Sequence, residues 1–267
     1  MNKSRIDITK VLPEDCIAFV ISKTSPRNAC RSSLVSHAFQ SAADSDGVWG
    51  GCLPSDLQEI ISKSDQPSQR LLSTLSKKKL YFYLCHNPIL INNGTMSFAL
   101  EKENGKKRYM VGARSLSIAW GDAPSYWTWE HLPESRFSQV ARLKEVWRLD
   151  VKGRIEARIL SNHTTYAAYF VFKFANPTVG FDKNPVEMNV HFEGSTTSGT
   201  KRQAFLDPPK KIRQVVKDRE DGWMEVEMAK FINESGDDGT ILCGLKEVVH
   251  YKYGLIIQGI EFRPGLY

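Results

Sequence analysis

Aromatic side chains gather in one short stretch of the sequence, residues 118–130, which reads IAWGDAPSYWTWE. It holds three of the chain's six tryptophans, Trp120, Trp127 and Trp129, together with Tyr126. The glycine, aspartate and proline between the rings favour a turn. Aromatic rings on either side of a turn form either a corner of the core or a platform on which the apolar face of a ligand can stack.

The other chemically active residue types form no catalytic or metal-binding pattern. The six histidines are dispersed, and the sequence has no nucleophile elbow, no phosphate-binding glycine loop and no HExxH motif. The five cysteines are widely spaced and lack a CxxC pair, which is typical of reduced thiols in a cytoplasmic or nuclear protein. We therefore expect no enzyme active site, no metal and no cofactor.

The net charge of +6 raises the question of a nucleic-acid partner. The basic residues are scattered, however, with short runs at 77–79, 106–108 and 210–213 and no nucleic-acid-binding motif beside them. A solvated surface is the better interpretation. No apolar run approaches the roughly 18 residues of a membrane span, and the opening MNKSRIDITK lacks the apolar core of a signal peptide. We expect neither a nucleic acid nor a membrane as partner.

The first fifty residues predict a small helical module. A helix opens at Leu12 and Pro13, where proline is tolerated because a first-turn N–H has no helical partner. A second helix is expected to begin at Ser25 and to carry an apolar stripe over residues 34–42, and a short third element carries Trp49. Three short helices bury little surface by themselves, so an apolar module of this size is expected to share its surface with a partner.

This module resembles an F-box, with LPE at residues 12–14, VSHAF at 35–39 and Trp49 at the matching spacing. The resemblance implies that its helices dock on the Skp-type adaptor of a cullin–RING (SCF-type) ubiquitin ligase. The alternative is that its apolar residues pack only against each other. The residues that match the adaptor-binding positions are Leu12, Pro13, Ile17, Val20, Leu34 and Val35.

The rest of the chain divides into a connector and a strand-rich domain. We expect the F-box over residues 7–53, a helical connector over 54–79 and a β-sandwich over 80–267. The run LYFYL at 80–84 is interpreted as the first of many short strands, which alternate in polarity and are separated by Gly, Pro and Asn turns. Residues 134–144 are expected to include a helical turn.

The strand-rich domain resembles the Nictaba-type lectin domain of plant phloem lectins. The likeness covers residues 109–267 and rests on 118–130 with its flanks ARSLSI and SRFSQVARLKEVWRLDVKGRIE, and on TTYAAYFVFK, DGWMEVEM and GLIIQGIEFRP. It implies an α+β multidomain protein in which a three-helix F-box and a helical connector precede an antiparallel sandwich of the jelly-roll lectin type. It also implies binding of N-acetylglucosamine (GlcNAc) oligomers or N-glycan cores.

The resemblance implies a carbohydrate site made of two tryptophans and two acidic residues. By motif the tryptophans are Trp120 and Trp127, and one acidic position is Glu247. The other falls on Thr240, a departure that replaces a charged acceptor by a neutral hydroxyl and removes a hydrogen bond worth about 1.5–3 kcal/mol; an aspartate at 237–238 is an alternative acceptor. The tryptophans expected in the core are Trp129, Trp147 and Trp223.

Together the two resemblances imply the substrate-recognition subunit of a ubiquitin ligase, working in the cytoplasm, the nucleus or both. Its expected partners are the Skp-type adaptor, the cullin, and a client protein or glycoprotein that carries a GlcNAc-type glycan. The alternative is a nucleocytoplasmic stress protein that binds carbohydrate or protein and has no role in a ligase.

Overall fold

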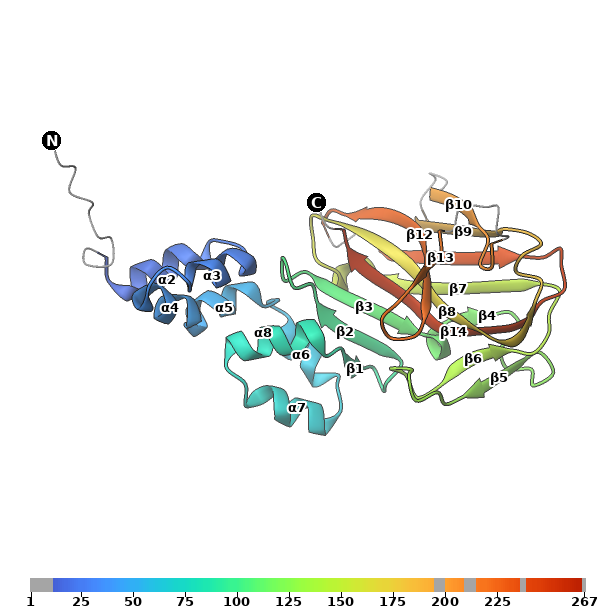
Figure 1. Ribbon diagram of the computed structural model, residues 1–267, viewed down its shortest axis with the longest axis horizontal. Helices are drawn as coiled ribbons and strands as arrows, with labels where there is room; N and C mark the ends of the chain where they lie inside the picture. The colour runs from blue at the N-terminus through green and yellow to red at the C-terminus, as the bar shows by residue number, and fades with distance from the viewer. Residues whose placement is uncertain (1–11, 195–199, 209–214, 236–238, 266–267) are drawn as a thin grey trace. The chain divides into compact units, whose positions relative to one another are not determined.

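The computed structural model describes residues 12–194, 200–208, 215–235 and 239–265, and divides the chain into two compact units (Figure 1). The chain through Ile89, together with Ala99–Lys107, forms the first unit; Leu90–Phe98 and the chain from Arg108 onward form the second. The beginning of the expected F-box, residues 7–11, lies outside the described residues. Across the described ranges, no helix is both long and apolar enough to cross a membrane.

The first unit is built from short helices whose starts are fixed by local hydrogen bonds. Side chains of Ser25, Ser36, Asp65 and Ser76 each accept a backbone N–H of the helix that follows, as N-caps do. Trp49 is fully buried, and its indole N–H donates to the Ala43 carbonyl at 2.7 Å. The helices are α2 (Glu14–Ser22), α3 (Pro26–Ser32), α4 (His37–Asp44), α5 (Asp46–Cys52), α6 (Leu57–Ser62), α7 (Gln66–Ser73) and α8 (Lys77–His86).

Two expectations for the helices were wrong. The second predicted helix is two helices, α3 and α4, because the Ser36 hydroxyl accepts the Phe39 N–H and starts a new helix there. The run at 80–84, predicted as a strand, lies in α8. Its buried members Leu80, Tyr81 and Leu84 fall at i, i+1 and i+4, so that a run apolar enough for a strand also presents one helical face to the core.

The second unit is an antiparallel β-sandwich, which confirms the predicted fold class. One sheet follows the order β1-β2-β3-β14-β8-β12-β11, with β6 paired to β14 and β5 to β6; the other is β10-β9-β13-β7-β4. The strands are β1 (Ile89–Ile91), β2 (Met96–Leu100), β3 (Lys107–Gly112), β4 (Ser117–Ile118), β5 (Trp127–Glu130), β6 (Val140–Leu143), β7 (Leu149–Glu156), β8 (Thr164–Val179), β9 (Val186–Phe192), β10 (Thr200–Ala204), β11 (Lys217–Asp218), β12 (Met224–Asn233), β13 (Thr240–Glu247) and β14 (Tyr253–Pro264).

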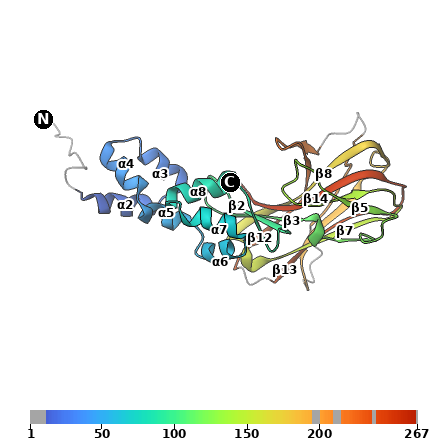
Figure 2. The same cartoon turned by 90° about the horizontal axis from the view of Figure 1, so that it is seen from below.

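The two sheets pack face to face, with the layer of β8 and β14 above that of β7 in Figure 2. Burial alternates residue by residue along β7, so that one face of the strand is in the core and the other faces solvent. The sheets approach closely at Gly153 of β7, where a Cβ atom would lie 2.7 Å from Cδ1 of Ile260 on β14. Residues 134–144 contain turns and β6 rather than the expected helical turn.

A buried carboxylate holds the larger sheet together. Glu261 of β14 is 2% exposed at its side chain and accepts a hydrogen bond from Arg219 at 2.7 Å. Arg108 of β3 lies 3.3 Å from the same carboxylate, and Arg136, in the turn before β6, lies 3.5 Å from it. Glu225 of β12 also accepts from Arg219, at 2.7 Å, and so joins a further strand to the cluster.

This cluster shifts the pKa of Glu261. Burial alone would raise the pKa of the carboxyl, but the guanidinium groups of Arg219, Arg136, Arg108 and Arg263 outweigh burial and lower it from 4.5 to about 2. The ionised form is therefore favoured in the folded state, and its contribution to stability is complete above about pH 4.5 and is lost as pH falls through about 2.

The variant Glu261→Gln tests this contribution. We expect it to lower the free energy of unfolding by about 3–5 kcal/mol at neutral pH, because it removes the buried negative charge that faces Arg108, Arg136 and Arg219. Its stability should also depend less on pH between about 4.5 and 2 than that of the unmodified chain. Urea titrations followed by tryptophan fluorescence report the second unit, because five of the six tryptophans lie there.

Glu156→Gln is the matched control, since that carboxylate is 53% exposed and pairs with Arg158 at the surface. Identical pH dependence in Glu261→Gln and in the unmodified chain would contradict the assigned role.

Candidate functional site

Three loops of the sandwich are joined by backbone hydrogen bonds at one end of the smaller sheet. The loop at 119–126 is held to the start of β7 by the Ala119 N–H, which donates to the Asp150 carbonyl at 2.9 Å. The Lys144 N–H donates to the Tyr126 carbonyl at 2.8 Å, and Val146 and Lys252 exchange two bonds of 3.0 and 2.8 Å. Segments 119–126, 144–148 and 248–251 therefore form one surface, which we call the loop platform.

Two aromatic residues of the loop platform are presented to solvent by the first loop. Trp120 is 50% exposed, and its ring lies 5.5 Å from that of Tyr126, which is also exposed. Trp120 has a φ of +56°, a left-handed conformation that costs a non-glycine residue about 1–2 kcal/mol. Strain of this kind persists where the surrounding structure imposes it, and it concentrates at functional sites.

The other two tryptophans of the stretch hold that loop in place. Trp127 is only 2% exposed, and its indole N–H donates to the Ala119 carbonyl at 3.1 Å. The indole N–H of Trp129 donates to the Gly121 carbonyl at 2.9 Å, while the guanidinium of Arg114 lies 3.7 Å from its ring. The structure thus buries Trp127, which was predicted as a stacking residue, and leaves its face unavailable to a ligand.

A second aromatic pair, one ring exposed and one half-buried, comes from the other two loops. Trp147 is 66% exposed, and its ring makes an edge contact with Tyr251 at 6.0 Å. The prediction that Trp147 lies in the core was wrong, whereas Trp223 is buried as predicted. The position of Trp147 in the sequence could have indicated its exposure. It precedes β7 by two residues and so lies in a loop rather than on the alternating face of a strand.

Glu247 organises the third loop and is itself almost fully buried. Its carboxylate accepts the N–H groups of Val249 and His250 at 2.7 and 3.3 Å and forms an ion pair with buried Lys252. Burial raises the pKa of Glu247, but these hydrogen bonds and the charge of Lys252 outweigh burial and lower it. Lys252 in turn donates to the Trp147 carbonyl at 3.0 Å and so links two of the loops.

Thr240 lies away from the loop platform. It pairs with Glu156 at one end of β13, whereas Glu247 pairs with Leu149 at the other end. Seven residues of strand separate them by about 23 Å, at roughly 3.3 Å per residue. The structure therefore brings Trp120 and Glu247 to the same end of the sheet and leaves Thr240 at the opposite end; the alternative acceptors at 237–238 lie outside the described residues.

The loop platform is suited to binding rather than to catalysis. Exposed indole and phenol rings can stack on the C–H face of a pyranose or on an apolar peptide side chain. The Arg148–Asp150 ion pair, at 3.0 Å, and partly exposed His250 provide polar groups beside them for hydroxyl or amide partners. The described parts of the chain contain no group of three or more His, Cys, Asp or Glu side chains that could hold a metal ion.

The residues predicted to bind an adaptor separate into exposed and buried members. Val20, Leu34 and Val35 are 60%, 84% and 66% exposed, Pro13 is exposed and Leu12 is half-buried. Ile17 lies in the core of the module instead, at 3% exposure. Phe19, at 63% exposure, is a large apolar surface residue that the sequence pattern did not single out.

The chain matches the family model for phloem protein 2 (PP2) over residues 106–264 and the model for the F-box domain over residues 11–50. The two matches together define a class of protein in which an F-box precedes a PP2-type sandwich. The chain belongs to the family of F-box proteins with a phloem protein 2 domain. Neither matching model is that of a catalytic family.

Two Arabidopsis thaliana relatives are similar over nearly the whole chain. F-box protein At2g02240 is 44% identical over 95% of this chain and 79% of its own length. F-box protein PP2-B10 is 42% identical over 95% of this chain and 93% of its own length. A solved family 35 carbohydrate binding module from Clostridium thermocellum is similar over 59% of this chain and 98% of its own, with 10% identity and a TM-score of 0.33. Similarity that remote says nothing about what this chain binds.

Because Trp120 is presented to solvent and Trp127 supports the loop, we expect their replacement to have different effects on the free energy of unfolding. Trp120→Gly should change the free energy of unfolding by less than about 1 kcal/mol, because relief of the positive φ offsets the lost contact with Tyr126. Trp127→Ala should cost about 3–5 kcal/mol, since it opens a cavity in the core. Denaturant unfolding followed by far-UV circular dichroism measures both, and a larger loss in Trp120→Gly than in Trp127→Ala would refute the division.

Proposed function

We propose that this chain is the substrate receptor of a cullin–RING (SCF-type) ubiquitin ligase. Its F-box docks a Skp-type adaptor, and its PP2 domain binds a client through a GlcNAc-containing glycan. Transfer of ubiquitin belongs to the partner subunits, and this chain contributes the proximity and orientation of the client. The observation that carries the proposal is an exposed apolar surface within the residues that match the F-box model.

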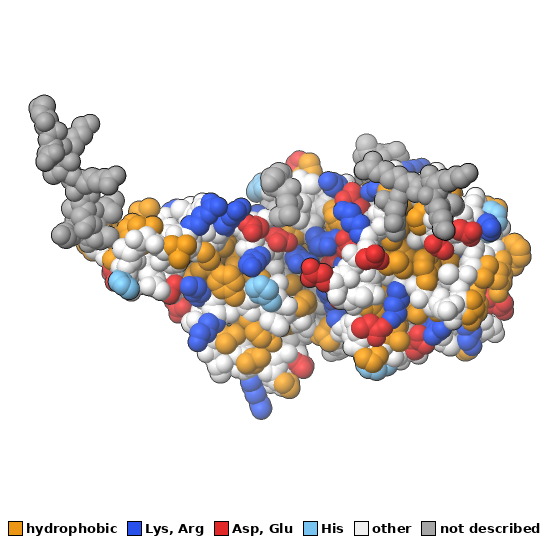
Figure 3. Space-filling view, in the orientation of Figure 1, with side chains coloured by type: hydrophobic (Ala, Val, Ile, Leu, Met, Phe, Trp, Pro, Cys, Tyr) orange, Lys and Arg blue, Asp and Glu red, His pale blue; other side chains and the backbone are white. Residues whose placement is uncertain are grey.

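That surface is made of Phe19 and Val20 on α2 and of Leu34 and Val35 in the turn between α3 and α4. Each of the four side chains is at least 60% exposed, and hydrophobic atoms reach the surface over these helices in Figure 3. Single exposed apolar residues are ordinary, but four within seventeen residues of sequence are costly to leave in water and favour a protein partner. The match to the F-box model supports a Skp-type adaptor as that partner.

Client binding is assigned to the loop platform, with Trp120, Tyr126, Trp147 and Tyr251 as the stacking surface. The match of residues 106–264 to phloem protein 2 supports a glycan as the bound group. Glu247 acts through Lys252 and the 248–251 loop, which it positions, rather than by direct contact with a sugar. The five free cysteines support a reducing compartment, so we place the protein in the cytoplasm or nucleus.

Replacing one exposed residue of the apolar surface tests the adaptor assignment. We expect Val35→Asp to weaken binding of a recombinant plant Skp-type adaptor by at least about tenfold, because it places a carboxylate in a desolvated contact. Biolayer interferometry with the full-length chain measures the affinity. The matched control is Val179→Asp, which changes a 47% exposed valine of β8 in the second unit.

An unmodified, folded chain that does not bind the adaptor would remove the ligase role and favour a carbohydrate- or protein-binding stress protein. Equal affinity in Val35→Asp and Val179→Asp would show that the adaptor, if bound, docks elsewhere.

A further inference from the structure

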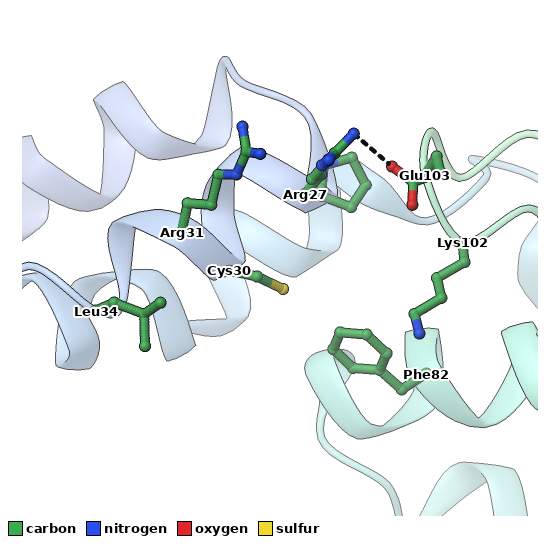
Figure 4. A pocket seen from close by; sticks show the side chains of 8 residues that line it. Arg27, Cys30, Arg31, Leu34, Phe82, Lys102 and Glu103 are labelled. Atoms are coloured by element: carbon green, nitrogen blue, oxygen red, sulfur yellow. Dashed lines mark ion pairs between the residues drawn. The ribbon is translucent and has the colours of Figure 1, made fainter. Parts of the chain in front are cut away.

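A pocket of about 230 Å³ lies within the first unit (Figure 4). One wall comes from α3, another from α8, and the third from residues 102–103 at the tip of the β2–β3 hairpin. All of these segments belong to the same compact unit. The volume is somewhat below the roughly 300–1,000 Å³ of pockets for drug-sized ligands, and therefore suits a molecule of one or two rings.

The inner walls of the pocket are apolar. Cys30 of α3 lies on the side of the pocket opposite the ring of Phe82 on α8, Leu34 lies at the far edge, and Pro26 also lines the pocket. Phe82 is held in place by the ring of Trp49 at 5.2 Å and by that of Tyr81 at 5.5 Å. A flat apolar molecule entering between α3 and Phe82 would exchange water for ring and aliphatic contacts.

The rim of the pocket carries an excess of positive charge. Arg27, Arg31 and Lys102 provide three cations, and Glu103 provides one carboxylate, which lies 3.5 Å from Arg27. Among the described residues, the structure shows no carboxylate partner for the side chains of Arg31 and Lys102. In Figure 4 the Lys102 ammonium points toward Phe82, where it can meet a negative group, while the Arg31 guanidinium points away from Phe82 and adds positive charge at the rim.

The hairpin tip that provides Lys102 is fixed to the helices rather than free. The Tyr81 hydroxyl lies within hydrogen-bond distance of the carbonyls of Glu101 and Lys102, at 3.2 and 3.0 Å. A Cβ atom on Gly105 would lie 2.6 Å from the Cys52 carbonyl oxygen, so only glycine permits this close approach. The backbone of Lys102 is thus held beside the pocket before any ligand arrives, so that only its side chain has to be ordered on binding.

We propose that this pocket binds a small organic anion whose body is a flat apolar ring and whose head is a carboxylate. The ring lies between α3 and Phe82, the carboxylate accepts a hydrogen bond from Lys102, and Arg31 adds positive charge at the rim. The apolar walls disfavour a bare inorganic anion, and the excess of positive charge favours a charged head over a neutral one. The site is separate from the loop platform, and its occupancy does not depend on the ligase role.

Isothermal titration calorimetry of the full-length chain with 2-naphthoate and its neutral isostere 2-naphthamide tests the proposal. We expect 2-naphthoate to bind at least about tenfold more tightly than 2-naphthamide, because only the carboxylate forms charge-assisted hydrogen bonds. Arg31→Gln/Lys102→Gln should abolish that preference. Arg70→Gln/Lys77→Gln removes two positive charges outside the pocket and should leave the affinity within about twofold, because the lost interactions are distant and screened.

Three results would overturn the proposal: no binding of 2-naphthoate at millimolar concentration, equal affinity for the two probes, or unchanged affinity in Arg31→Gln/Lys102→Gln. Competition separates a ring-carboxylate site from a plain anion site. Inorganic phosphate at equal concentration should fail to displace 2-naphthoate, and displacement would show that the apolar walls contribute nothing. None of these variants changes Val35, so failure here and failure of adaptor docking are distinguishable.

Discussion

Buried ion pairs flank both ends of β14, and the sandwich depends on them. Near its C-terminal end, Glu261 is surrounded by arginines from three segments that are distant in sequence and by Arg263 of β14 itself. Just before its N-terminal end, Lys252 pairs with Glu247 at the end of β13. A buried charge without its partner costs several kcal/mol, so each pair restricts where its strands can lie. The second pair also fixes the loop that carries Tyr251, and in this way core electrostatics and the binding surface are connected.

The tryptophans of the stretch at 118–130 divide into two that support the first loop of the platform and one that this loop presents to solvent. The indole N–H groups of Trp127 and Trp129 donate hydrogen bonds to backbone carbonyls of the first loop. Trp120 can then be held at a positive φ with half of its surface in water. A flexible loop would relax this strain and bury the ring. The rigidity of the supporting pair therefore makes an exposed platform possible at low entropic cost to a ligand.

The architecture could be predicted from the sequence because capping residues and polarity patterns indicate the same helices and strands. Alternation along β7 and the N-capping Ser25 identify elements whose local preference matches their final environment. Prediction failed at 80–84, where a short apolar run satisfies a strand and a helix equally well and tertiary contacts decide. It also failed to separate α3 from α4, since only the Ser36 side chain marks the break.

The binding surface was predicted only in part, because it depends on how separate loops come together in space. Residue types located the first loop and Trp120, but exposure depends on which loops meet in space. Trp147 and Trp127 have the same residue type and opposite environments, so residue type alone does not distinguish them. Thr240 and Glu247 were predicted to contribute to the same carbohydrate site, yet they lie at opposite ends of one strand. The pocket beside Phe82 involves residues from three separate segments, and nothing local to any of them indicates it.

The most direct test of the account is a glycan-array measurement on the full-length chain, alongside Trp120→Gly and Trp147→Ala. The account predicts that the unmodified chain binds GlcNAc-containing glycans and that each folded variant loses most of this binding, because each removes one stacking face of the loop platform. Absence of glycan binding by the unmodified chain, or binding that survives in both variants, would contradict it.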